Sequence, residues 1–177
     1  MSFTSQPSVN LWIDRLALIM ENSPLLFAKK NNAGNSNLIQ QVIKYKFPIP
    51  ESPPEGLGPP HLYITAPDDY IRRREQKGRD NRDQQGAEGV FFELYIIALS
   101  QKNTAMESQQ QLYSITNAIE NIIKTNKRLL DPTTNSDPYA FSIDVVDIPF
   151  VLDTDASNML ARNVVVRPEA NVNQRTS

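Results

Sequence analysis

The sequence predicts an α+β protein: one domain, a mixed or antiparallel sheet of about four strands, two main helices packed on one face, and long loops. Three observations support this class. The length of 177 residues corresponds to one domain. Two segments, 8–22 and 104–130, repeat apolar residues at spacings of three and four, as helices do. Short segments rich in aromatic and β-branched residues lie between and after them, as is typical of strands.

Composition excludes several classes of function. Eighteen Lys and Arg against 20 Asp and Glu give a net charge of −2, so no overall basic field attracts nucleic acid or membranes. There is no cysteine, which excludes disulfides, thiolate metal sites and cysteine nucleophiles. The N-terminus lacks the basic start and apolar stretch of a signal peptide, and no apolar run approaches transmembrane length. We therefore expect a soluble protein of a reducing compartment, with 1–177 forming a single domain.

The folded core is expected over residues 8–168 and begins with an amphipathic helix. Between 8 and 22, Trp12, Leu16 and Ile19 belong to an apolar stripe with helical spacing, and Pro24 prevents the helix from continuing. A polar loop over 31–37 follows. The segment 38–47 alternates only loosely, which fits a short strand or a helical turn equally well.

A proline-rich segment over 48–60 predicts an extended, partly polyproline-like arm on the surface. The residues HLYITA, 61–66, then predict a strand that Pro67 closes. His61 is the only histidine of the chain. No serine or carboxylate stands at a recognisable catalytic spacing from it, so we interpret it as the first residue of the strand.

The segment 68–88 is predicted to be a long mobile loop, because almost no apolar residue follows Ile71 and because basic and acidic residues alternate along it. In an assembly, such a segment is expected to form ion pairs with a neighbouring subunit. Its basic residues are the candidate assembly contacts: Arg72, Arg73, Arg74, Lys77, Arg79 and Arg82.

The segments with the clearest strand pattern and the clearest helix pattern follow this loop. VFFELYIIAL, 90–99, predicts a central strand. Thr104 and Glu107 form a capping-box pattern, and an apolar stripe continues the helix to 130, where Asp131–Pro132 ends it. The opposite helix face is polar and is either solvated or in contact with another subunit; it carries Gln109, Gln110, Asn117, Glu120, Asn121 and Lys124.

Two closing strands, 141–148 and 160–167, are predicted to form an antiparallel pair. Asp147 interrupts the alternation of the first, and Pro168 is expected to end the second. The polar residues 169–177 are expected to form a flexible tail.

The sequence predicts no catalytic, cofactor-binding or metal-binding residues, and hence no enzyme and no cofactor. Gly-rich phosphate loops and the HExxH and GxSxG patterns do not occur in it. The acidic pairs at 68–69, 80/83 and 153/155 lack the Gly and Glu of a calcium loop and are interpreted as solvated turns. A carboxylate pair formed only by tertiary approach is the remaining enzymatic alternative.

Four local sequences carry a resemblance to a known family: PPHLYITAP, GVFFELYIIAL, NIIKTNKRLLDP and ARNVVVRPE. With the order of elements over 8–168, they resemble tail-terminator or tail-completion proteins of long-tailed bacteriophages, minor tail proteins of the head–tail joint. The segments 48–60 and 68–88 look longer than such proteins need.

This resemblance implies a structural virion protein of the tail or neck, assembled in the host cytoplasm. The expected assembly is a homohexameric ring that caps the tail tube and joins it to the head and neck. The expected partners are therefore further copies of the chain, the tail tube protein and neck or connector proteins. DNA would pass through the ring lumen without sequence-specific binding, and no membrane is involved.

Two alternatives stay open at this point. A neck or head–tail connector subunit belongs to the same class and has the same features. A nucleic-acid-binding accessory protein would use the basic residues of 72–82 for phosphate contacts. The interleaved acidic residues oppose that use, and no aromatic residue after Tyr70 is available in the loop for base stacking.

Overall fold

The computed structural model describes residues 9–45, 58–67, 71–75, 88–127, 142–147, 152–153 and 158–172. The helices and strands along these residues are, in order, α1 (Val9–Glu21), β1 (Gln41–Lys44), β2 (His61–Thr65), β3 (Ile71–Glu75), β4 (Glu88–Phe92), β5 (Leu94–Gln101), α2 (Ala105–Thr125), β6 (Ser142–Asp147), β7 (Leu152–Asp153) and β8 (Met159–Val172).

All the described strands belong to one eight-stranded sheet with the order β1-β2-β5-β8-β4-β3, and β6 and β7 also pair with β8. Strand β1 is parallel to β2, and the other pairs are antiparallel. The predicted α+β class with a mixed sheet is confirmed. The sheet has more strands than the predicted number of about four. The open segment 38–47 forms β1, the segment 90–99 is divided into β4 and β5, and the polar β3 and short β7 carry no apolar alternation that a pattern could detect.

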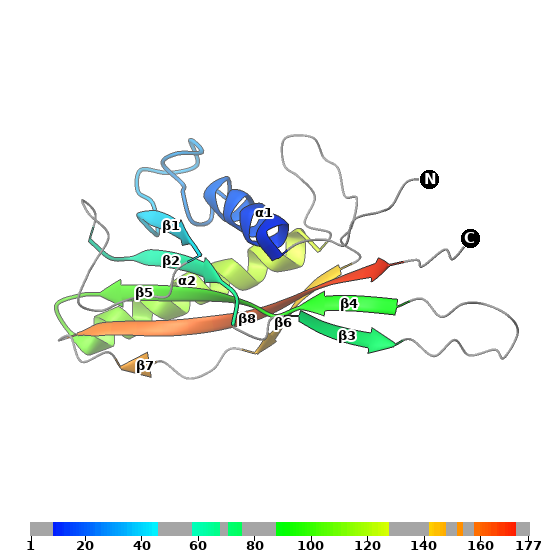
Figure 1. The fold of residues 1–177 in the computed structure, drawn as a ribbon. Helices are drawn as coiled ribbons and strands as arrows, with labels where there is room; N and C mark the ends of the chain where they lie inside the picture. Colours follow the sequence, from blue (N-terminus) through cyan, green and yellow to red (C-terminus); the bar gives the residue numbers. More distant parts are fainter. Residues whose placement is uncertain are drawn as a thin grey trace, which may run out of the picture.

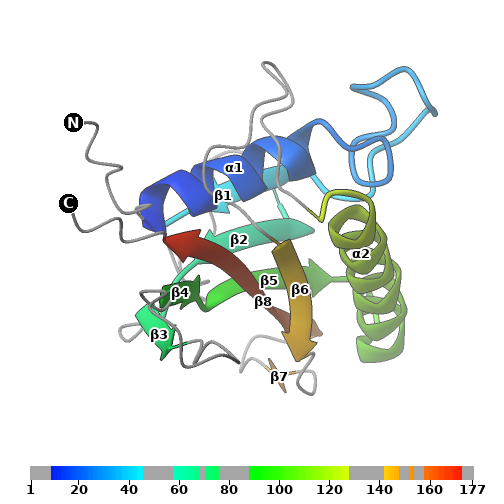
Figure 2. The same ribbon diagram turned by 90° about the vertical axis from the view of Figure 1, so that its right-hand side faces the viewer.

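Both helices cover the same face of the sheet. Helix α1 contacts β1 and β2, and α2 contacts β5, β6 and β8 (Figures 1 and 2). The main core lies in this layer and includes Leu16, Leu62, Ile96, Ile119 and Val164, all fully buried. In β2, β5 and β8, alternate residues therefore point toward the helices, as the period of two requires.

Helix α1 matches the predicted segment 8–22, and β1 resolves the open choice at 38–47 in favour of a short strand. The capping box of α2 is confirmed, because the Thr104 hydroxyl accepts from the Glu107 N–H at 3.2 Å while the Glu107 carboxylate accepts from the Thr104 N–H at 3.3 Å. Each group satisfies an amide that the first helical turn leaves without a partner.

The predicted end of α2 at 130 was wrong. The helix ends at Thr125, and the side-chain amide of Asn126 donates to the Ile122 carbonyl at 2.8 Å. The Asn126 backbone N–H also bonds the carbonyls of Ile122 and Ile123. These contacts terminate the helix before Asp131–Pro132, which lies outside the described residues together with Leu129 and Leu130.

The prediction of a loop over the whole of 68–88 was also wrong. Residues 71–75 form β3, which pairs antiparallel with β4 so that Arg72 lies opposite Phe91 and Arg74 opposite Gly89. A strand at the end of a sheet needs backbone hydrogen bonds to one neighbour, and it forms without an apolar stripe of its own. Residues 68–70 and 76–87 lie outside the described part of the chain.

The predicted strand 90–99 is divided at Glu93 into β4 and β5, and β5 is central as expected, between β2 and β8. Strand β8 continues to Val172, so the predicted stop at Pro168 was wrong. Its partner changes from β5, last paired at Val166, to β4, first paired at Glu169. Pro168 lies opposite this break, where the ladder on that side is already interrupted, so its missing N–H costs little.

The antiparallel pairing of β6 with β8 is confirmed, and a register shift occurs between Val145 and Asp147. The predicted flexible tail was wrong for residues 169–172, which are part of β8. The proline-rich arm falls outside the described residues over 46–57, and 173–177 lie outside them as well.

Candidate assembly surfaces

The hairpin formed by β3 and β4 is the first candidate surface. It extends beyond the part of the sheet that the two helices cover, together with the C-terminal end of β8 (Figure 1). Among the candidate contact residues, Arg72, Arg73 and Arg74 are consecutive in β3, which ends the strand order of the sheet. The other three, Lys77, Arg79 and Arg82, lie outside the described residues. The fold therefore brings three of the six candidate positions into one strand.

The outward face of α2 is the second candidate surface. The sequence SQQQLYSITNAI, 108–119, contains no charged residue, although it belongs to a helix with one exposed face. Gln110, Ser114 and Asn117 are exposed on it. Charged residues are depleted at the centres of protein interfaces, so this composition is more typical of a contact face than of a freely solvated helix.

Two large apolar side chains protrude near the N-terminus of this helix. Met106 is 66% exposed and Tyr113 is 44% exposed. The Arg162 guanidinium lies 4.8 Å from the centre of the Tyr113 ring, and the Gln109 side-chain amide donates to the Tyr113 hydroxyl at 2.8 Å. A cation over its face and a donor at its hydroxyl hold this ring in place.

The backbone beneath these residues is firmly anchored. The buried Ser108 hydroxyl donates to the Asn158 carbonyl at 2.6 Å and accepts from the Lys102 N–H at 2.8 Å. The Asn158 side chain donates to the Asn103 carbonyl at 2.8 Å, and Ser100 and Gln111 are hydrogen-bonded through their side chains. Because these bonds tie the first turn of α2 to the ends of β5 and β8, Met106 and Tyr113 are displayed from a rigid support.

A groove lies where the end of α1 meets the end of α2. Its volume is about 290 Å³, and all the residues that line it are uncharged, including Ile19, Leu25, Ile122 and Thr125. Leu25 is 49% exposed in it. A second depression of about 350 Å³ lies between α2 and β6 and is lined by charged groups such as Glu120 and Lys124. The groove at the helix ends is therefore the more apolar of the two.

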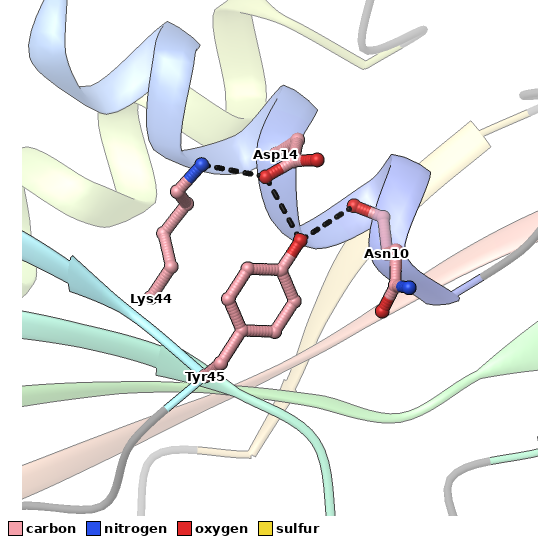
Figure 3. A network of polar contacts seen from close by, with 4 residues as sticks. All are labelled: Asn10, Asp14, Lys44 and Tyr45. Atoms are coloured by element: carbon pink, nitrogen blue, oxygen red, sulfur yellow. Dashed lines mark hydrogen bonds and ion pairs between the residues drawn. The ribbon is translucent and has the colours of Figure 1, made fainter.

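A polar network fastens α1 to β1 (Figure 3). The Lys44 ammonium lies 2.7 Å from the Asp14 carboxylate, and the Tyr45 hydroxyl donates to the same carboxylate oxygen at 2.9 Å. The Tyr45 hydroxyl also lies 3.4 Å from the Asn10 carbonyl. Tyr45 adopts the left-handed conformation with φ of 62° at the end of β1.

The contacts of this network and its partial burial shift the pKa values of Asp14, Lys44 and Tyr45. The hydrogen bond from Lys44 lowers the pKa of Asp14, and the hydrogen bond to Asp14 raises the pKa of Lys44. Burial, followed by the hydrogen bond to Asp14, raises the pKa of Tyr45. The network is thus an ion pair at neutral pH and serves to position α1 against the sheet.

His61 is confirmed as the first residue of β2, where it is fully buried and meets Tyr63 edge-on, with ring centres 6.4 Å apart. Both belong to the sheet face opposite the helices. That face has its own buried apolar cluster, which sequence patterns did not reveal: Tyr63, Ile97, Leu99, Met159 and Ala161. Burial in this cluster raises the pKa of Tyr63.

Among the described residues, no three His, Asp or Glu side chains lie close enough together to hold a metal ion. Within the same residues, no helix has the length and apolar character needed to cross a membrane. The contact features that sequence reasoning missed are Met106, Tyr113 with Arg162, and the groove at Leu25. The uncharged run 108–119 was a visible signal for Tyr113, whereas Met106 lies outside this run and the groove exists only because α1 and α2 meet.

Comparisons with known proteins add a structural likeness. No protein-family model and no curated protein matches the chain. Among solved structures, it is similar to a chain in the virion of a native gene transfer agent particle, with a TM-score of 0.49 and 10% sequence identity. The similarity covers 94% of this chain and 100% of that chain.

Proposed function

We propose that this protein is a structural, non-enzymatic virion subunit: a ring-forming tail terminator or tail-completion protein that caps the tail tube and joins it to the neck. The observation that carries the proposal is the β3–β4 hairpin, which extends beyond the part of the sheet that the helices cover and has Arg72–Arg74 in its outer strand (Figure 1). The resemblance of residues 8–168 to phage tail-terminator proteins supports the same assignment.

Ring formation requires that each subunit present two different surfaces, one to each neighbour. The sheet path of the described residues ends at β1 on one side and at β3 on the other. Outer strands offer backbone donors and acceptors that a neighbouring chain can pair with. A hairpin that reaches past its own helical layer is well placed for such a contact, and the basic residues of β3 would favour an acidic neighbour.

A neck or connector subunit is the alternative within the same class. Purified protein should co-sediment with isolated tail tubes and increase the yield of infectious particles when added to tails that lack a terminator. Binding to filled heads and not to tails would favour the neck assignment instead.

The nucleic-acid alternative has one observation in its favour, the three consecutive arginines of β3. The same hairpin places Glu75 opposite Glu88, which reduces its positive charge. Binding of a DNA duplex with a steep salt dependence and no ring formation would support this alternative over the virion role.

The ring itself is tested by light scattering and negative-stain electron microscopy of the purified chain. The expected result is a closed homohexamer. A monomer at every concentration, also in the presence of tail tubes, would overturn the proposed function.

A further inference from the structure

The helical layer carries two apolar surface features, one that protrudes and one that is hollow. We call Met106 and Tyr113, with Arg162 stacked on the tyrosine, the knob, and the depression lined by Ile19, Leu25 and Ile122 the groove. The knob lies near the start of α2 and the groove at its end. We infer that the knob of one copy binds in the groove of the next copy, which deepens the proposed ring by assigning one of its subunit contacts.

The knob has the properties of an interface anchor. Met106 is mostly exposed and Tyr113 nearly half exposed, and at a spacing of seven residues the two lie on the same side of α2. Methionine, tyrosine and arginine are the residue types enriched at interface centres. The Tyr113 ring is already fixed by Arg162 and Gln109, so binding it costs little side-chain entropy.

The groove has room for such an anchor. A cavity of about 150 Å³ is enough to hold a benzene molecule, and this groove measures about 290 Å³. Its apolar lining comes from Ile19, Leu25 and Ile122. Leu25 remains half exposed in the isolated chain and would become buried by an inserted side chain.

The charges of the two features also match. Every residue that lines the groove is uncharged, and the helix face behind the knob is uncharged from 108 to 119. The one cation of the knob, Arg162, is stacked on the Tyr113 ring. Insertion of the uncharged Met106 and Tyr113 side chains therefore places no unpaired charge in the groove, a cost that a charged side chain would incur, and Arg162 keeps its stacking contact with the Tyr113 ring.

Geometry makes this a contact between copies. Met106 and Ile122 are separated by about 24 Å along α2 at a rise of 1.5 Å per residue. Tyr113 and Thr125 point about 120° apart around the same helix at 100° per residue. One copy cannot fill its own groove with its own knob. Two different surfaces that fit each other in a head-to-tail manner generate a ring when the rotation closes.

Cysteine cross-linking tests the contact directly, because the chain has no cysteine of its own. Under oxidising conditions, a mixture of the M106C and L25C variants should give covalent dimers, and the double variant should give a ladder of covalent oligomers. Each single variant should stay monomeric on a non-reducing gel. A mixture of M106C with Q40C, at an exposed position before β1, is the matched control and should not cross-link.

Charge insertion provides the second measurement. M106E and L25E should each raise the apparent dissociation constant of the assembly at least about tenfold, while their melting temperatures stay unchanged because both positions are exposed. Q40E should leave assembly unchanged.

The outcomes separate this inference from the proposed function. Rings that form normally in both charge variants, or cross-linking of M106C to itself, would overturn the knob-and-groove contact and leave the ring assignment standing. Both the contact and the proposed function would be overturned if the unmodified chain stays monomeric at every concentration, also with tail tubes, and the mixture of M106C and L25C gives no covalent dimer.

Discussion

At the scale of single residues, the helical layer and the polar contacts at its margin have different roles. Ile119 is fully buried between α2 and the sheet, whereas Asn117, two positions earlier, is exposed. Asp14, Lys44 and Tyr45 hold α1 in place from the surface (Figure 3). Apolar burial supplies most of the stabilisation and the polar network adds orientation.

Ile119→Ala should lower the free energy of unfolding by about 2 to 5 kcal/mol, because it removes buried methyl groups and leaves a cavity under α2. Urea denaturation monitored by circular dichroism measures the change. Asn117→Ala on the exposed side of the same helix is the control, with an expected change within about 0.5 kcal/mol. A loss below about 0.5 kcal/mol for Ile119→Ala would contradict its place in the core.

Acid should weaken the contact between α1 and β1. The pKa of Asp14 is lowered in the folded chain, so its contribution to stability is present above its unfolded value of about 3.9 and is lost as pH falls through the folded pKa. Unfolding of the protein and of Asp14→Asn should therefore differ at pH about 7 and converge toward pH about 2.

The difference should stay below about 1 kcal/mol, because both partners of the pair are substantially exposed. In a Lys44→Met background, the effect of Asp14→Asn should shrink and lose most of this pH dependence. A pH-independent difference would mean that the carboxylate charge does not act through Lys44.

At the scale of elements, hydrogen-bonded ends determine where α2 begins and stops. The capping box of Thr104 and Glu107 starts it, and Thr125 and Asn126 end it before the predicted position. The anchored first turn also presents Met106, and Tyr113 follows about two turns later on the same side of the helix. The hydrogen bonds at the start of α2 therefore also fix the position of the candidate contact face.

Thr104→Ala should lower the free energy of unfolding by about 1 kcal/mol, because the Glu107 N–H loses its acceptor at the start of α2. Thr104→Ser keeps the hydroxyl and should restore most of the loss, which makes it the matched control. Chemical denaturation checks both variants. Unchanged stability in Thr104→Ala would show that the cap contributes nothing to the fold.

At the scale of the whole molecule, one sheet combines two regions with different surroundings. Helices cover the part formed by β1, β2, β5 and β8, whereas β3 and β4 extend away from them (Figures 1 and 2). This division separates a stable body from an outlying hairpin. It also means that the hairpin can be altered with little disturbance of the core.

Replacing residues 70–87 with a short Gly-Ser turn should leave the melting temperature nearly unchanged and abolish ring or tail assembly. The physical reason is that β3 is the last strand of the sheet path and pairs with β4, so the main core under the helices stays intact. Differential scanning calorimetry and light scattering measure the two effects. Normal assembly of this variant would show that the residues between 70 and 87 are not assembly contacts.

The sequence by itself determines the class of fold, the two helices, the central strand and the closing antiparallel pair. Apolar periodicity carries this information for the helices, as Leu112, Ile115 and Ile119 show in α2, whereas aromatic and β-branched composition carries it for the central strand, which is buried on both faces. The capping box is equally local, since Thr104 and Glu107 are three residues apart.

Only the tertiary structure decides the features that depend on neighbours distant in the sequence. Strand β3 exists because β4 supplies its hydrogen bonds, and Pro168 stays within β8 because the ladder beside it changes partner there. The groove forms only where the ends of α1 and α2 meet, and Arg162 reaches Tyr113 across the helix–sheet boundary. Periodicity describes how one segment buries itself, whereas these features arise from which segments lie side by side.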